Sequence, residues 1–181
     1  HKGGYTPFDI RIDTAYDWNR EFNILTVVVD STERSDIPPF GGQIDYLTYG
    51  GIYREVSLGI YDDIFIKNVK VETRGIYDDE KSLNLIVHLE NLNQQSGNAQ
   101  FIVRINETNG EEVCYREFNT YVEISRNIYS FNIDNLKGIK LWDIDNPNLY
   151  EIKISMEINN CSDEYIDTFG FREAVFKPDG F

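Results

Sequence analysis

Long apolar runs are missing from this sequence. No window approaches the roughly 18 consecutive apolar residues that a membrane-spanning helix needs, and the first residues, HKGGYTPF, lack the apolar segment of a signal peptide. We therefore predict no membrane partner. Because the chain begins with His1 and not with Met, we expect it to be a piece of a longer protein, for which a missing signal gives no information on the compartment.

Basic residues are also scarce. The 181 residues include 17 Lys and Arg against 31 Asp and Glu, which gives a formal net charge of −14. A protein that binds nucleic acid by neutralising phosphates needs a basic surface, and this balance does not supply one. The composition predicts no nucleic-acid partner.

Residues that bind metals or act as nucleophiles are few. Cys114 and Cys161 cannot staple a fold of this size, so we expect free thiols in the core or at a sheet edge, with a bridge between them as the alternative. His1 is the terminus, and His88 alternates with apolar residues in a predicted strand, where it faces solvent. No CxxC pair, HExxH, GxSxG or Gly-rich phosphate loop is present. The sequence predicts no metal and no cofactor.

Strand-forming residues are abundant, with 12 Tyr and 11 Phe beside a single Met. Short segments that alternate apolar with polar residues, bounded by Gly, Asn, Asp and Pro, recur along the chain. They predict no helix and ten strands: Phe8 to Ile12, Asn23 to Asp30, Ile52 to Tyr61, Ile64 to Thr73, Ser82 to Glu90, Ala99 to Asn106, Glu112 to Thr120, Ile128 to Ile133, Tyr150 to Ile158 and Glu164 to Phe171. The predicted fold class is all-β.

The spacing of these strands changes near Tyr61 and divides the chain. Beyond it, each strand and its turn take about 10 to 15 residues, as in an immunoglobulin-like sandwich of seven or eight strands. We predict this β-sandwich for residues 62–173, whereas residues 1–61 hold only about four strands and have the signature of a truncated domain. The residues expected to face the sandwich core are Leu85, Val87, Phe101, Val103, Phe131, Leu149 and Ile152.

Acidic residues gather at several predicted turns. Asp143, Asp145, Asn146 and Asn148 superficially resemble a calcium loop, but the central Gly and the bidentate Glu of such a loop are missing. Asp and Asn around a proline are the ordinary composition of a turn. The strand-end residues Asp62, Asp63, Asp78, Asp79 and Glu80 are likewise most simply solvated charges, with Ca²⁺ binding as the alternative.

One loop, residues 35–54, has a composition suited to sugar recognition. It places Asp36, Asp45, Tyr46, Tyr49 and Arg54 among glycines, which let a ligand approach the backbone closely. A carboxylate accepts hydrogen bonds from sugar hydroxyls, and an aromatic ring covers the apolar C–H face of a pyranose. A purely structural role for this loop is the alternative.

Several motifs together resemble glycoside hydrolase family 2, the group of β-galactosidases, β-glucuronidases and β-mannosidases. GGYTPFDIRI, NILTVVVDSTERSDIPPFGG and DYLTYGGIYREVSL are similar to the second half of that family's sugar-binding jelly-roll domain. LWDIDNPNLYEIKISM and DTFGFREAVFKPDGF are similar to the last strands of its immunoglobulin-like domain and to its exit toward the catalytic barrel. The order and spacing of the motifs agree with the family along the whole chain.

The resemblance implies a role for each part. Residues 1–61 would be the C-terminal part of the jelly-roll domain, and residues 174–181 the start of a linker to a catalytic barrel that this chain does not include. Asp45 would contact the glycone of a β-glycoside substrate, with possible support from Tyr46 and Tyr49, and Arg54 would be structural, pairing within the sheet. Trp142, Pro147 and Tyr150 would be core and turn residues.

The function implied is that of non-catalytic modules. The family's two catalytic glutamates lie in the barrel and perform a retaining double displacement, so no catalytic residue is predicted in this chain. Its partners would be the barrel of the same chain and, through the parent enzyme, a β-glycoside, with a galactoside favoured by the run GGQIDYLTYGGIYREV. An independent carbohydrate-binding or adhesive immunoglobulin-like module is the alternative. The sugar and the oligomeric state stay open.

Overall fold

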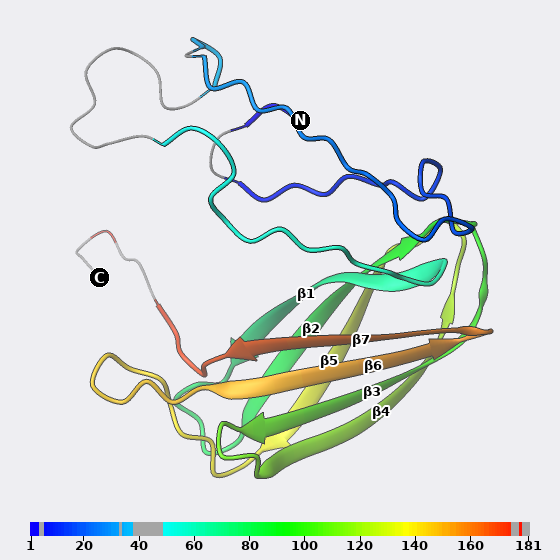
Figure 1. The fold of residues 1–181 in the computed structure, drawn as a ribbon. Helices are drawn as coiled ribbons and strands as arrows, with labels where there is room; N and C mark the ends of the chain where they lie inside the picture. Colours follow the sequence, from blue (N-terminus) through cyan, green and yellow to red (C-terminus); the bar gives the residue numbers. More distant parts are fainter. Residues whose placement is uncertain (4–5, 33, 38–48, 175–177, 179–181) are drawn as a thin grey trace. The chain divides into compact units, whose positions relative to one another are not determined.

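Seven antiparallel strands in two facing sheets are the regular secondary structure of the described residues in a computed structural model (Figure 1). The structure describes residues 1–3, 6–32, 34–37, 49–174 and 178. The first sheet has the order β1-β2-β5, with strands β1 (Ile64–Arg74), β2 (Lys81–Asn91) and β5 (Ile128–Leu136). The second has the order β4-β3-β6-β7, with strands β3 (Gly97–Glu107), β4 (Glu112–Val122), β6 (Tyr150–Ile158) and β7 (Cys161–Phe169). The all-β prediction is confirmed, and the described residues contain no helix.

The core lies between the two sheets because side chains alternate along each strand. On β2, Leu83, Leu85, Val87 and Leu89 are at most 3% exposed, whereas Ile86 between them is half-buried on the other face. Among the residues expected in the core, those confirmed as buried are Leu85, Val87, Phe101, Val103, Phe131 and Ile152.

Leu149 contradicts the predicted core, since its side chain is 40% exposed. The next residue, Tyr150, begins β6 and is 1% exposed, so it takes the inward position. Alternation of the side chains then places Leu149 on the outer side. The predicted start of the last strand was also late: β7 begins at Cys161 because a two-residue turn, with Asn159 in the left-handed conformation at φ 52°, joins it directly to β6.

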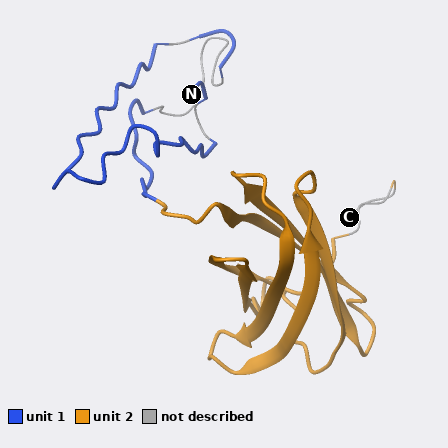
Figure 2. Ribbon diagram, turned by 90° about the vertical axis from the view of Figure 1, so that its right-hand side faces the viewer, with its two compact units in different colours: residues 1–58 blue, residues 59–181 orange. Residues whose placement is uncertain are grey.

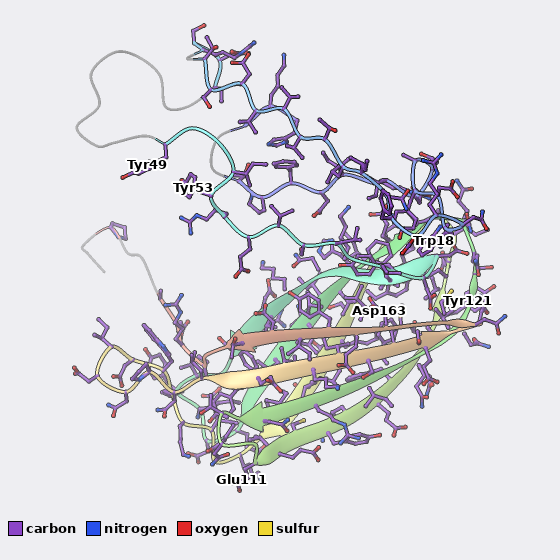
Figure 3. The ribbon with its side chains drawn as sticks, viewed as in Figure 1. Trp18, Tyr49, Tyr53, Glu111, Tyr121 and Asp163 are labelled. Carbon is purple, nitrogen blue, oxygen red and sulfur yellow. The ribbon has the colours of Figure 1, made fainter. Side chains whose placement is uncertain are left out.

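The edge strands β1 and β7, which belong to different sheets, are joined by a partly buried polar contact. The register of β1 shifts between Ile66 and Asn68, and such a bulge leaves a backbone group without its ladder partner. The Ile66 N–H donates to the Asp163 carboxylate at 2.7 Å. Asp163, labelled in Figure 3, therefore satisfies the bulge from the opposite sheet.

The chain divides into two compact units, His1–Leu58 (unit 1) and Gly59–Phe181 (unit 2), coloured blue and orange in Figure 2. All seven strands belong to unit 2. The assignment of residues 1–61 to a jelly-roll domain, of 62–173 to the sandwich and of 174–181 to a linker stays a prediction.

Three predicted strands, Phe8 to Ile12, Asn23 to Asp30 and Ile52 to Tyr61, are not strands in the structure. Their sequences follow the pattern of a strand, but a strand exists only where a neighbouring strand pairs with its N–H and C=O groups. No such ladder occurs among the described residues of unit 1. Consequently its apolar side chains stay in water, with Ile24 84% and Val28 89% exposed.

Candidate functional site

The loop predicted to recognise sugar is described at its two ends only. Asp45 and Tyr46, the carboxylate and one aromatic residue of that prediction, lie outside the described residues. Tyr49 is 72% exposed, and its ring meets that of Tyr53 edge-on at 6.2 Å (Figure 3). The C-terminal end of the loop thus presents two aromatic faces to solvent, the surface that stacking on a pyranose requires. The role of Tyr49 stays a prediction.

The Arg54 side chain contacts an aromatic ring. Its guanidinium carbon lies 5.6 Å from the centre of the Tyr53 ring, within the range of a cation–π interaction. Gly51, three residues earlier, adopts a left-handed φ of 94° and has open space where a side chain would project. A turn of this conformation favours glycine, which explains the second Gly of the GGIYR motif.

Asp36, another carboxylate of the same loop, is occupied locally. Arg34 donates two hydrogen bonds to it, each 2.9 Å long. These bonds lower the pKa of the Asp36 carboxyl and raise that of the Arg34 guanidinium. Both side chains are exposed, so the pair adds little to stability. Because the Arg34 guanidinium already occupies it, the Asp36 carboxylate is poorly suited to bind a ligand.

The strand-end carboxylates of unit 2 hold turns in place. Asp62 accepts a 2.9 Å hydrogen bond from the Ser162 N–H, and Asp63 accepts one of 3.3 Å from the Gln95 side chain. With Asn159, they line a hollow of about 380 Å³ at one end of the sandwich. The carboxylates therefore fasten the chain entering β1 to the turns beside it.

The acidic turn that superficially resembles a calcium loop is closed by its own first residue. The Asp143 carboxylate accepts the backbone N–H groups of Asp145 at 2.8 Å and Asn146 at 2.7 Å. This is the hydrogen bonding of an ordinary Asx turn. In the part of the chain that the structure describes, no three His, Cys, Asp or Glu side chains are grouped to hold a metal ion.

The thiols are free, as predicted. Cys114 is buried on β4, and burial raises the pKa of its thiol, while Cys161 is half-buried at the start of the edge strand β7. His88 is half-buried on β2, so the expectation that it faces solvent is met only in part. No helix of the described residues is long and apolar enough to cross a membrane.

Sequence reasoning missed a polar network on the outer face of the first sheet. Asn84, only 7% exposed, donates to Glu72 at 3.0 Å and accepts from Ser130 at 2.6 Å, which links all three strands of that sheet. Hydrogen bonds from Lys70 and then Asn84 lower the pKa of Glu72 to about 2. The available signal was an Asn inside the apolar run LNLIV, since a polar residue there needs a partner.

The comparisons with known proteins agree on one family. Residues 64–172 match the profile of the family described as glycosyl hydrolases family 2. A beta-galactosidase from Thermoanaerobacterium thermosulfurigenes is 79% identical over 181 residues, which are 100% of this chain and 25% of that relative. A beta-galactosidase from Rhizobium meliloti is 34% identical over 99% of this chain and 23% of its own length. The chain thus spans about a quarter of the length of the curated relatives that it matches.

Solved structures show the same fold. The crystal structure of a Bacteroides uniformis beta-glucuronidase aligns with a TM-score of 0.65 over 79% of this chain and 18% of that one, at 19% identity. At this level of identity the likeness concerns the fold alone, and it confirms the β-sandwich.

Proposed function

Because this chain belongs to the glycosyl hydrolases family 2, we propose that it supplies non-catalytic modules of a larger glycosidase that cleaves β-galactosides. The observation that carries this proposal is the 79% identity to a beta-galactosidase along the entire chain. The sandwich of unit 2 would support a catalytic barrel in the same polypeptide, and the loop of residues 35–54 would contribute a glycone contact. Both catalytic carboxylates would lie outside these 181 residues.

Hydrolysis by the short and the complete polypeptide tests this proposal. Retaining hydrolysis needs two carboxyl groups about 5 Å apart on either side of the scissile bond. We expect the purified 181-residue chain to release no product from an aryl β-galactoside, and the complete protein to release it with retention of configuration. Heat-labile turnover by the short chain, or an inactive complete protein, would contradict the proposal.

Within the proposed function, Asp45 is the residue that would touch substrate. A hydrogen bond to a charged group contributes about 1.5–3 kcal/mol, so Asp45→Ala should lower kcat/KM of the complete enzyme by about 10- to 150-fold. The melting temperature should stay unchanged. Asp36→Ala is the matched control from the same loop, because Asp36 is engaged by Arg34. We expect the control to keep wild-type kinetics.

A rival role for Asp45 is to cap its own loop through backbone N–H groups. Under that rival, Asp45→Ala lowers the melting temperature together with activity. Kinetics measured on protein of unchanged melting temperature therefore separate the two roles, and a joint loss would count against the glycone contact.

A further inference from the structure

Two motifs of unit 2 that lie far apart in the sequence meet at the point where the chain leaves the sandwich. Leu141, from the LWDIDNPNLY motif, forms a parallel β-bridge with Phe171 of the FGFR motif. The Trp142 N–H donates to the Phe171 carbonyl at 3.0 Å. We call the group formed by Thr73, Leu141, Trp142 and residues 170–172 the exit clamp.

The segment of LWDIDNPNLY that carries Trp142 is itself held firmly. The Lys140 N–H donates to the buried Tyr150 hydroxyl at 2.9 Å, and the Asn148 side chain donates to the Leu141 carbonyl at 2.9 Å. Tyr150 begins strand β6, and its hydroxyl is hydrogen-bonded to backbone upstream. This arrangement is the tyrosine corner of immunoglobulin-like folds. The two residues before Trp142 are therefore both held by hydrogen bonds to neighbouring parts of unit 2.

Residues 170–172, which we call the exit segment, pack closely against the other residues of the clamp. Phe171 is fully buried, with its ring 5.3 Å from those of Tyr150 and Phe169. A Cβ at Gly170 would lie 2.8 Å from the Cβ of Trp142, which is closer than real Cβ contacts. The Trp142 Cβ is bonded directly to the backbone, so it cannot rotate away. The φ of Gly170 lies outside the left-handed region, so contact distance alone makes glycine necessary here.

Arg172 contacts both Trp142 and strand β1 of the first sheet. Its guanidinium lies 4.9 Å from the centre of the Trp142 ring, and its carbonyl accepts a 3.0 Å hydrogen bond from the Thr73 hydroxyl on β1. The next residues, Glu173 and Ala174, are exposed coil. The contacts of the clamp thus end at Arg172, and exposed coil follows directly.

We propose that the exit clamp is a positioning device, which sets the direction in which the chain leaves unit 2 toward the catalytic domain that follows. Trp142, Gly170 and Arg172 are positioning residues, since none of them would touch substrate. The inference rests on the proposed function, in which the 181 residues connect a glycone contact to a barrel. A misplacement of about 1 Å can lower an enzymatic rate about 100-fold, which makes such alignment measurable.

The local part of the test uses the 181-residue chain. It contains two tryptophans, so Trp18→Phe leaves Trp142 as the single indole reporter. In that background, Gly170→Ala should shift the Trp142 emission and speed hydrogen exchange of the Trp142 amide about tenfold, while the amides of β3 and β6 keep their protection. Gly97→Ala is the matched control, because its Cβ would meet only the movable amide end of Asn159.

The kinetic part uses the complete enzyme with an aryl β-galactoside. Gly170→Ala should lower kcat/KM about tenfold when variant and wild type are assayed well below their melting temperatures, where both are fully folded. Arg172→Gln, a surface change that leaves the fold intact, should lower it less, and Arg172→Lys should restore most of the loss because it keeps the cation over the Trp142 ring.

The possible outcomes separate the two levels of the argument. Wild-type kinetics in Gly170→Ala and Arg172→Gln, or a loss that merely follows the melting temperature, would overturn the positioning role. An inactive wild-type enzyme would instead count against the proposed function, and the unchanged emission of Trp142 in Gly170→Ala would count against the clamp alone.

Discussion

Residues 24–29 of unit 1, ILTVVV, and residues 83–89 of unit 2, LNLIVHL, are both rich in apolar residues, and only the second run forms a strand. In unit 2 the second run is the central strand β2, paired on both sides and with its inward side chains fully removed from water. In unit 1 the first run is extended chain without a ladder, with Val28 89% exposed. The comparison teaches that alternation sets a preferred backbone shape, whereas a sheet needs partners for its hydrogen bonds.

Equal truncations in the two units should have the largest difference in effect. Ile105→Ala removes a side chain that is 0% exposed and should lower the free energy of unfolding by about 2–5 kcal/mol, since it leaves a cavity in the core. Ile24→Ala makes the same change where the side chain is 84% exposed, and should stay within about 0.5 kcal/mol of wild type. Urea unfolding followed by far-UV circular dichroism measures both. Similar losses of unfolding free energy in the two variants would contradict the contrast between the two units.

Removing a tyrosine hydroxyl from each unit should give a smaller difference. Tyr150→Phe takes away the acceptor of the Lys140 N–H and should reduce the free energy of unfolding by about 0.5–1.5 kcal/mol. Tyr53→Phe is the matched change in unit 1, where the side chain is 57% exposed and its hydroxyl has no hydrogen-bond partner among the described residues. It should have no measurable effect. The same urea titration decides, and a stable Tyr150→Phe would show that the corner is dispensable.

The acid dependence of stability should give the smallest difference. The pKa of Glu72 is lowered from 4.5 to about 2 in the folded chain, so the unfolded chain binds more protons between these values. The stabilising effect of ionised Glu72 is therefore complete above pH 4.5 and is lost as the pH falls toward 2. Glu72→Gln should therefore make the free energy of unfolding depend less steeply on pH over that interval.

Asp36→Asn is the control for this titration. Its carboxyl also has a lowered pKa, but the partner Arg34 is only two residues away, and the described residues of unit 1 contain no strand, so the pair can form in the unfolded chain too. We expect the acid branch of the unfolding curve to be unchanged in Asp36→Asn. An equal change in both variants would show that Glu72 owes its stabilising effect to its nearest neighbours in the sequence and not to Asn84 on β2.

Much of unit 2 could be predicted from the sequence because its elements are local patterns. The strand Tyr150–Ile158 was predicted residue for residue, and six of the seven expected core residues are buried, since period-two alternation determines which face each side chain occupies. The error at Leu149 arose at a strand end, where alternation has no fixed phase until the first ladder pair is formed. The candidate glycone residue came from family resemblance, and composition alone left its role open.

The sequence by itself determined the all-β class, the positions of the strands of unit 2, its turns and the family, because these depend on neighbours in the chain and on motif order. Only the tertiary structure decided which segments became strands and which motifs became a site. Asp163 reaches the bulge of β1 from the opposite sheet, Asn84 meets Ser130 across two strands, and Trp142 closes over Gly170 after a separation of 28 residues. Such contacts depend on how the two sheets fold over one another, and no local pattern of residues carries that information.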